Sequence, residues 1–167
     1  KMFWIPGEEL LAMTYANQIK LYSWQNRGET YTLKIDAWVV SACFVEETRT
    51  IHVIVLEGEN GARTYREMVW KKEGQEYVCI ESQEMVKMHL HGEPIEIIAN
   101  GQMLYVIYSQ GFVLKKAKKI GGDKVKFVEM LAQGCDLKNK KPVSVAKNEA
   151  KIVIGSDNRK LKIYTFS

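Results

Sequence analysis

The sequence feature that most limits the fold is a hairpin pattern that recurs along the chain. Leu10–Trp24 (LLAMTYANQIKLYSW) and Lys151–Phe166 (KIVIGSDNRKLKIYTF) each contain an apolar strand, a short polar turn, and a second strand that combines apolar residues with Lys and Tyr. Met103–Lys115 (MLYVIYSQGFVLK) is a third hairpin of similar length. Ile19 and Leu161 are equivalent in this alignment and lie 142 residues apart. That distance is three periods of about 47 residues, which predicts four copies of one supersecondary unit.

The segments between these hairpins also favour strands over helices. Short runs that alternate or stay apolar are followed by Gly, Asn, Asp or charged residues, which suit tight turns. Each period then holds four strands, which is the plan of a propeller blade. We therefore predict an all-β fold: a single β-propeller-like domain over residues 1–167, with about four blades of four antiparallel strands. The approximate blades are 1–37, 38–85, 93–132 and 141–167.

The last predicted blade has only three strands, which would leave an exposed edge. The sequence leaves three explanations open. The chain is part of a larger ring, it self-associates or is completed by a second chain, or its N-terminal residues supply the missing strand. The four tryptophans are predicted to pack between blades, with one at a rim as a potential interface anchor: Trp4, Trp24, Trp38 and Trp70.

Two segments resemble a known repeat family. Val145–Phe166 (VAKNEAKIVIGSDNRKLKIYTF) resembles the end of a WD40-type repeat, and Glu9–Trp24 resembles a more diverged copy. The family's Gly-His pair is missing, and Tyr164–Thr165 and Tyr22–Ser23 stand where its Trp-Asp pair would be. The resemblance implies a divergent WD40-like propeller that serves as a non-catalytic scaffold for protein–protein interaction.

Composition and cysteine spacing suggest where such a chain would work. The sequence is 46% apolar and 26% charged, as in ordinary globular proteins. It contains no apolar run near the roughly 20 residues of a membrane-spanning helix, and no signal peptide is visible. Cys43, Cys79 and Cys135 are far apart and odd in number, which favours buried thiols over a disulfide framework. We therefore expect a reducing, cytoplasmic location and no transmembrane segment.

The sequence offers no convincing catalytic or metal-binding constellation. The imidazoles of His89 and His91, together with Glu93, could bind a metal ion, but no third strong ligand joins the two histidines. Exposed loop histidines are the simpler interpretation. No GxSxG motif is present, and Gly155–Ser156–Asp157 is interpreted as a turn. His52 alternates with apolar neighbours and is expected to face solvent. We predict that the chain is not an enzyme and has no catalytic, cofactor or metal residues.

The clearest candidate for binding is basic. Residues 1–100 carry 10 Lys and Arg against 15 Asp and Glu, whereas residues 101–167 carry 14 against 5. Much of this excess lies in two stretches that we expect to be loops between blades, on the docking rim. We predict that their lysines contact a partner; Lys126 lies in the first stretch, and the candidate set is Lys115, Lys116, Lys118, Lys119, Lys124, Lys138, Lys140 and Lys141.

The partner of these lysines is predicted to be another protein. A phosphate-bearing partner, nucleic acid or phosphoinositide, is the alternative, because lysine clusters bind phosphates by releasing counterions. Nucleic acid is not favoured, because only Phe112 and Phe127 lie near the charges, whereas single-strand recognition usually interleaves aromatic side chains. A simple solvated face remains a third interpretation.

Overall fold

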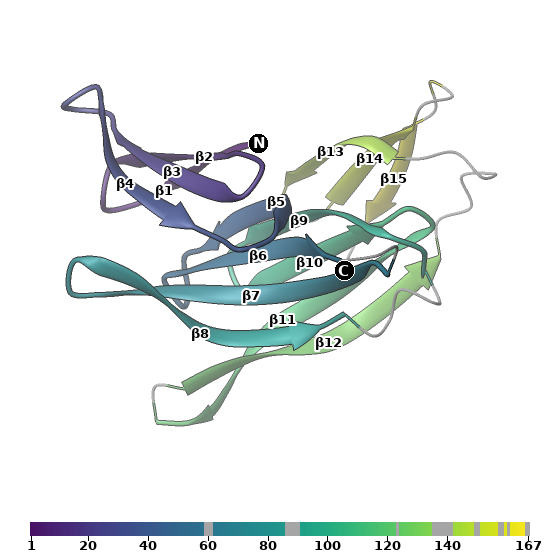
Figure 1. Ribbon diagram of the computed structural model, residues 1–167. Coiled ribbons are helices and arrows are strands. Elements are labelled where there is room, and N and C mark those ends of the chain that lie inside the picture. The colour runs from purple at the N-terminus through teal and green to yellow at the C-terminus, as the bar shows by residue number, and fades with distance from the viewer. Residues whose placement is uncertain are drawn as a thin grey trace. The chain divides into compact units, whose positions relative to one another are not determined.

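A computed structural model describes residues 1–58, 62–85, 91–122, 124–134, 142–148, 151–156, 159 and 161–165. Fifteen strands lie in these residues, which confirms the all-β prediction (Figure 1). The strands are β1 (Met2–Ile5), β2 (Leu10–Thr14), β3 (Gln18–Ser23), β4 (Gly28–Lys34), β5 (Trp38–Val45), β6 (Thr50–Glu57), β7 (Thr64–Glu73), β8 (Glu76–Glu84), β9 (Pro94–Asn100), β10 (Met103–Tyr108), β11 (Gly111–Gly121), β12 (Lys124–Gly134), β13 (Pro142–Asn148), β14 (Lys151–Ser156) and β15 (Leu161–Thr165).

The strands form four antiparallel sheets in chain order, as the repeat predicted. The first sheet is β1-β2-β3-β4, the second β5-β6-β7-β8, the third β9-β10-β11-β12 and the fourth β13-β14-β15. Within each sheet, every strand pairs with the strand that follows it in the sequence. Each sheet is therefore a meander whose pairings join segments close together in the chain.

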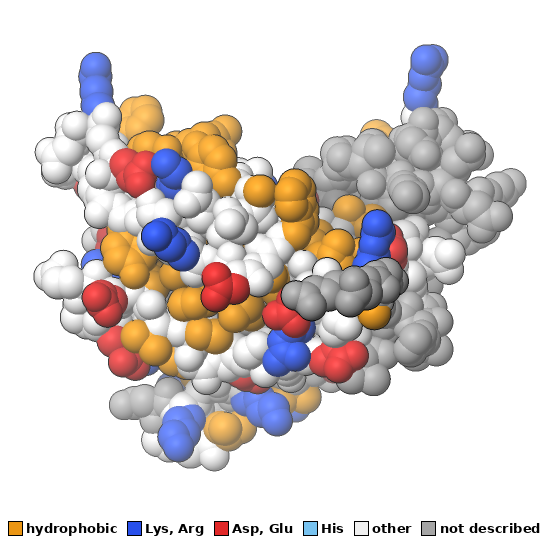
Figure 2. Space-filling view, in the orientation of Figure 1, with side chains coloured by type: hydrophobic (Ala, Val, Ile, Leu, Met, Phe, Trp, Pro, Cys, Tyr) orange, Lys and Arg blue, Asp and Glu red, His pale blue; other side chains and the backbone are white. Residues whose placement is uncertain are grey.

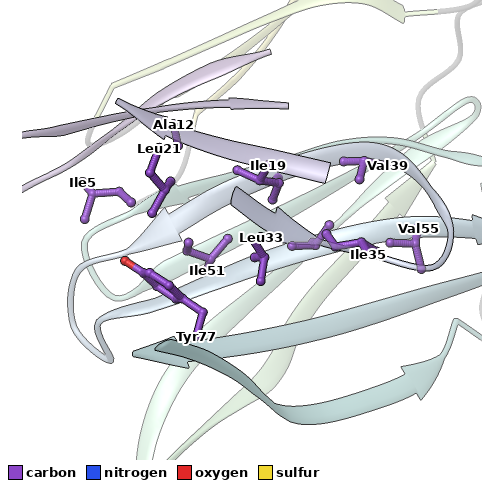
Figure 3. Packing of buried hydrophobic residues seen from close by; sticks show 12 residues of the cluster. Ile5, Ala12, Ile19, Leu21, Leu33, Ile35, Val39, Ile51, Val55 and Tyr77 are labelled. Carbon is purple, nitrogen blue, oxygen red and sulfur yellow. The ribbon is translucent and has the colours of Figure 1, made fainter. Parts of the chain in front are cut away.

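The chain divides into two compact units, Lys1–Met85 and Val86–Ser167. In the first unit, the first and second sheets share a hydrophobic core. Along a strand such as β3, core residues alternate with residues that face away from the core. On β3, Ile19 and Leu21 are fully buried, whereas Lys20 between them is not. Figure 3 shows these side chains facing Ile51 and Val55 of β6, with Tyr77 of β8 closing one side. Period-two alternation thus places one apolar face of each sheet in the core.

Polar contacts of the turn after β1 with a second turn and with β7 supplement this core. Glu8, in the turn after β1, accepts hydrogen bonds from Lys72 Nζ at 3.0 Å and from Arg49 Nη2 at 3.5 Å. Arg49 also donates to the carbonyl of Pro6 at 3.3 Å. Arg49 ends the turn between β5 and β6, so these bonds join the first and second sheets.

The second unit has its own core, between the third and fourth sheets. Tyr105 and Ile107 of β10, with Phe112 and Leu114 of β11, are buried together with Ile154 of β14. Tyr164 of β15 packs edge-on against Phe112, with ring centroids 4.8 Å apart.

Three hairpin turns of the first unit share one backbone feature. Glu9, Arg27 and Arg49 each occupy the last position of a four-residue turn and have φ between 50° and 52°. This left-handed conformation closes the turn and is uncommon for residues with a side chain. At this last position the three turns therefore place a residue with a side chain in a conformation that glycine adopts more readily.

The tryptophan prediction is wrong for three of the four residues. Trp4, Trp24 and Trp38 are 44%, 71% and 59% exposed, and only Trp70 packs against the core of the first unit. Trp24 lies in a turn and Trp38 begins a strand, where neighbouring sheets do not cover a large side chain. Bulk alone did not determine burial.

Candidate binding surface

The basic stretch forms a two-stranded ribbon. β10 pairs with β11 only as far as Lys116, whereas β11 and β12 continue to pair up to Gly121 and Lys124. Next to this point the Ala117 N–H donates a hydrogen bond to the Gln102 carbonyl, at 2.8 Å, in the turn before β10. Residues 118–126 therefore extend beyond the edge of β10 as a hairpin of their own.

The ribbon has two chemically different faces. Lys118 lies directly opposite Lys126, and Lys116 lies opposite Val128. Because alternate residues share a face, Lys124 joins this side, which we call the lysine face: Lys116, Lys118, Lys124 and Lys126. On the other side, Ala117 pairs with Phe127 and Lys119 with Val125, and Lys115 lies opposite Glu129.

The lysine face carries uncompensated positive charge. All four side chains are exposed, and none forms an ion pair with a carboxylate of the described residues. Figure 2 shows basic side chains gathered on the end of the ribbon. Like charges that face each other across a strand pair destabilise it, so an anionic group that binds here would relieve repulsion as well as form ion pairs.

The structure divides the predicted lysines between these faces. Lys116, Lys118 and Lys124 share the lysine face, whereas Lys115 and Lys119 lie on the opposite one. The expectation that this stretch is a loop between blades is wrong, because the stretch forms a hairpin within the third sheet. Lys126, which the candidate set omitted, belongs to the lysine face. The remaining three predicted lysines lie outside the described residues: Lys138, Lys140 and Lys141.

His52 is buried, which contradicts the expectation that it faces solvent. Its side chain is 3% exposed, and its Nδ1 lies 3.4 Å from Oε1 of Glu67, which is also 3% exposed. Its Nε2 lies 3.1 Å from Oγ1 of Thr50. Cys43 is the register partner of His52 on β5, but both ring nitrogens of His52 are already close to oxygen atoms. This arrangement satisfies buried polar groups.

The other candidate groups do not assemble into a reactive site in the described part of the chain. His91 packs its ring near Tyr108, with centroids 6.0 Å apart, whereas His89 lies outside the described residues. Across the described residues, no three His, Cys, Asp or Glu side chains gather so that they could hold a metal ion. Cys43 is a buried thiol, Cys79 is a partly exposed thiol, and Cys135 is not described.

Comparisons with known proteins bear on the fold. No protein-family model matches the chain, and no curated protein matches its sequence. Among solved structures it is similar to the computationally designed Ika4 protein, with a TM-score of 0.56 and 9% identity over 99% of this chain and 89% of that one. It is also similar to a functionally unknown protein from Desulfotomaculum acetoxidans, with a TM-score of 0.47 and 12% identity over 98% and 67% of the two chains. The likeness to Ika4 concerns the fold alone.

The structure also addresses membrane insertion by helices. In the ranges it describes, no helix has the length and apolar character needed to cross a membrane.

Proposed function

We propose that this chain is a non-catalytic scaffold for protein–protein interaction, built from WD40-like propeller blades. We further propose that the lysine face of the β11–β12 ribbon binds an acidic surface on the partner. The observation that carries the proposal is the row of four exposed lysines, none of which pairs with a carboxylate of the described residues, on one face of a hairpin that extends beyond its sheet.

The blade interpretation is supported by how sheets pack inside each unit. In the first unit, β1 lies against β5, and in the second, β9 lies against β13. These are the first strands of successive meanders. Neighbouring first strands are what radial repetition of four-stranded sheets around an axis requires. The overall likeness to Ika4, which extends over nearly the whole chain, is compatible with such a repeat.

An acidic protein fits the ribbon better than a nucleic acid does. Single-stranded nucleic acids usually stack their bases on aromatic side chains that lie among the basic ones. Here Phe127 points to the opposite face from Lys118 and Lys126, because it is in register with Ala117. Four ammonium groups without an aromatic platform suit carboxylates, each as a point charge. Phosphoinositide or nucleic acid binding is the alternative proposal, carried by the same four charges.

The contacts of His52 support the proposal that the chain is not an enzyme. The buried His52 uses its ring nitrogens in contacts with Glu67 and Thr50 and does not lie on an exposed turn beside a nucleophile. A nucleophilic site needs a base within reach of an accessible hydroxyl or thiol. Binding through surface charge needs no such arrangement.

The test compares one double variant with a matched control. Lys118→Glu/Lys126→Glu reverses two charges on the lysine face, and Lys34→Glu/Lys71→Glu reverses two exposed lysines of the first unit. The probes are a fluorescent polyglutamate peptide, a duplex oligonucleotide and phosphoinositide vesicles, each titrated at several salt concentrations. We expect the peptide to bind, and its Kd to rise at least about tenfold in the ribbon variant but not in the control.

The outcomes separate the two proposals. If only the oligonucleotide or the vesicles bind, and lose affinity in the ribbon variant, the anionic-polymer alternative replaces the acidic-protein proposal. For duplex DNA the logarithm of the binding constant should then fall with a slope of about −0.9 per phosphate contact. If the ribbon variant binds every probe as the control does, the lysine face is not the binding surface.

A further inference from the structure

One face of the first sheet is largely apolar over β1–β3 and is partly or fully exposed. Its rows are set by register: Met2 pairs with Met13, which pairs with Lys20, and Trp4 pairs with Leu11, which pairs with Tyr22. We call this surface face N: Met2, Trp4, Leu11, Met13, Lys20 and Tyr22. Met2 is 62% exposed and Trp4 44%. Figure 2 shows hydrophobic side chains on the surface over β1–β4. Lys20 on this face forms an ion pair with Glu29 at 2.8 Å, and on β4 the same side of the sheet is polar, with Glu29, Thr32 and Lys34.

The fourth sheet also leaves one face open. Val153 pairs with Ile163, and Gly155 with Leu161, so these four residues share a side that we call face C. Leu161 is 69% exposed and Ile163 62%. Exposed apolar side chains that lie together on one face can mark a surface for a protein partner.

Register shows that face N has a buried counterpart in the fourth sheet. Met13 pairs with Lys20 on β3, and Ile154 pairs with Lys162 on β15 in the same way. Tyr22 and Tyr164 each follow two residues later. In the fourth sheet this face is covered by the third: Ile154 is fully buried, and the Tyr164 ring packs on Phe112. Face N therefore repeats a surface that elsewhere in the chain receives a neighbouring sheet.

Face C likewise has buried counterparts. Leu161 and Ile163 occupy the places of Ile19 and Leu21 in the first sheet, two residues apart on the third strand. Both Ile19 and Leu21 are fully buried against the second sheet. In the third sheet, Phe112 and Leu114 hold the same places and are buried against the fourth. Face C thus repeats a surface that elsewhere packs onto the sheet that follows.

We propose that a second copy of this chain covers both faces, with face C of each copy packed on face N of the other. Face C resembles the faces that pack onto a following sheet, and face N resembles the faces that receive a preceding sheet. Within each unit the two sheets pack through this same pair of faces. The contact joins two different faces, and each copy contributes one face to each of two equivalent contacts. Leu161 and Ile163 would then contact Met13 and Tyr22, as Phe112 contacts Tyr164 within one copy. This assembly does not depend on the lysine face.

The test measures molar mass in solution by light scattering, with the strand content checked by circular dichroism. Wild type should have twice the mass of one chain. Met13→Glu, on face N, and Ile163→Glu, on face C, should each be monomeric, because each buries a charge in both contacts. Ile120→Glu is the matched control: Ile120 is 61% exposed but lies on the β11–β12 ribbon, so this variant should remain dimeric.

Mixing the two monomeric variants distinguishes this contact from any other dimer. Ile163→Glu retains an intact face N, and Met13→Glu retains an intact face C, so a mixture can form one wild-type contact. We expect the mixture to regain dimer mass, with weaker affinity than wild type. A monomeric wild type, a dimer that survives both substitutions, or a mixture that stays monomeric would each overturn the proposal. None of these results alters the charge-reversal test of the lysine face.

Discussion

Lys118 and Lys126 lie directly opposite each other across β11 and β12. Two lysines in such a pair repel, because their side chains project from the same face at adjacent positions. Neither is paired with a carboxylate of the described residues. A hairpin that retains this repulsion gives up stability locally and keeps a charge cluster that is available for binding.

This relationship predicts that one substitution improves stability while it impairs binding. Lys118→Glu replaces a repulsive cross-strand pair with an attractive one, and the free energy of unfolding should rise by about 0.5 kcal/mol. The same change should weaken polyglutamate binding. Urea denaturation and peptide titration on one preparation measure both effects. Lys34→Glu is the control, because it makes the same charge change elsewhere. A loss of stability in Lys118→Glu would contradict the repulsion argument.

The four meandering sheets were predictable because their signals are local. Each hairpin joins strands that are neighbours in the sequence, and turn residues mark where the chain reverses. The basic ribbon was not predictable in the same way. Lysine has little preference for strands, so a run of lysines from Lys115 to Lys119 indicated a loop. Pairing with Val125, Phe127 and Val128 on β12 holds the run in a strand, and that pairing follows from register.

His52 shows a second reason why the sequence pattern did not predict the structure. Alternation of polar and apolar residues indicates an exposed face only when a single side of a strand is buried. The residues from Thr50 to Val55 on β6 are buried on both sides, so the polar position carries a buried side chain. Glu67 and Thr50, which accommodate it, come from a neighbouring strand and from two residues earlier. Nothing in the local pattern around His52 identifies Glu67 as its neighbour.

The turn between β3 and β4 predicts a stabilising substitution. Arg27 has φ near 50°, is exposed, and ends the four-residue turn before Gly28. Glycine adopts this conformation without steric cost, so Arg27→Gly should raise the free energy of unfolding by about 0.5–1 kcal/mol. Arg27→Ala removes the same side chain but keeps a Cβ, so it should give no gain. Equal stability of the two variants in urea would mean that the backbone at this turn is not strained.

The core of the first unit predicts a large loss on truncation. Ile51 is fully buried on β6 among the side chains of the first and second sheets. Ile51→Ala removes buried methyl groups and leaves a cavity, so unfolding free energy should fall by about 2–5 kcal/mol. Ile80 on β8 is 51% exposed, and Ile80→Ala is the matched control, with an expected loss of less than about 1 kcal/mol. Similar losses in urea denaturation would show that Ile51 is not a core residue.

Tyr77 predicts how stability changes at high pH. Burial is the main cause that raises the pKa of Tyr77 to about 12, and the nearby Glu8 carboxylate adds to the shift. In the unfolded chain the phenol should ionise near its ordinary pKa of 10. Between these values the unfolded chain has lost the proton that the folded chain retains, so rising pH favours unfolding. The stabilising contribution is complete below pH 10 and is lost between about pH 10 and 12.

Tyr77→Phe isolates this effect, because phenylalanine keeps the ring beside Tyr31, whose centroid lies 5.4 Å away, but has no proton to lose. Across that pH range the wild type should lose about 2–3 kcal/mol more unfolding free energy than the variant does, at about 1.4 kcal/mol per unit of pKa shift. Urea denaturation at pH 9, 10, 11 and 12 measures the difference directly, since other titrating groups contribute to both proteins alike. If Tyr77→Phe follows the wild-type curve, the phenol of Tyr77 ionises equally readily in the folded and unfolded chains.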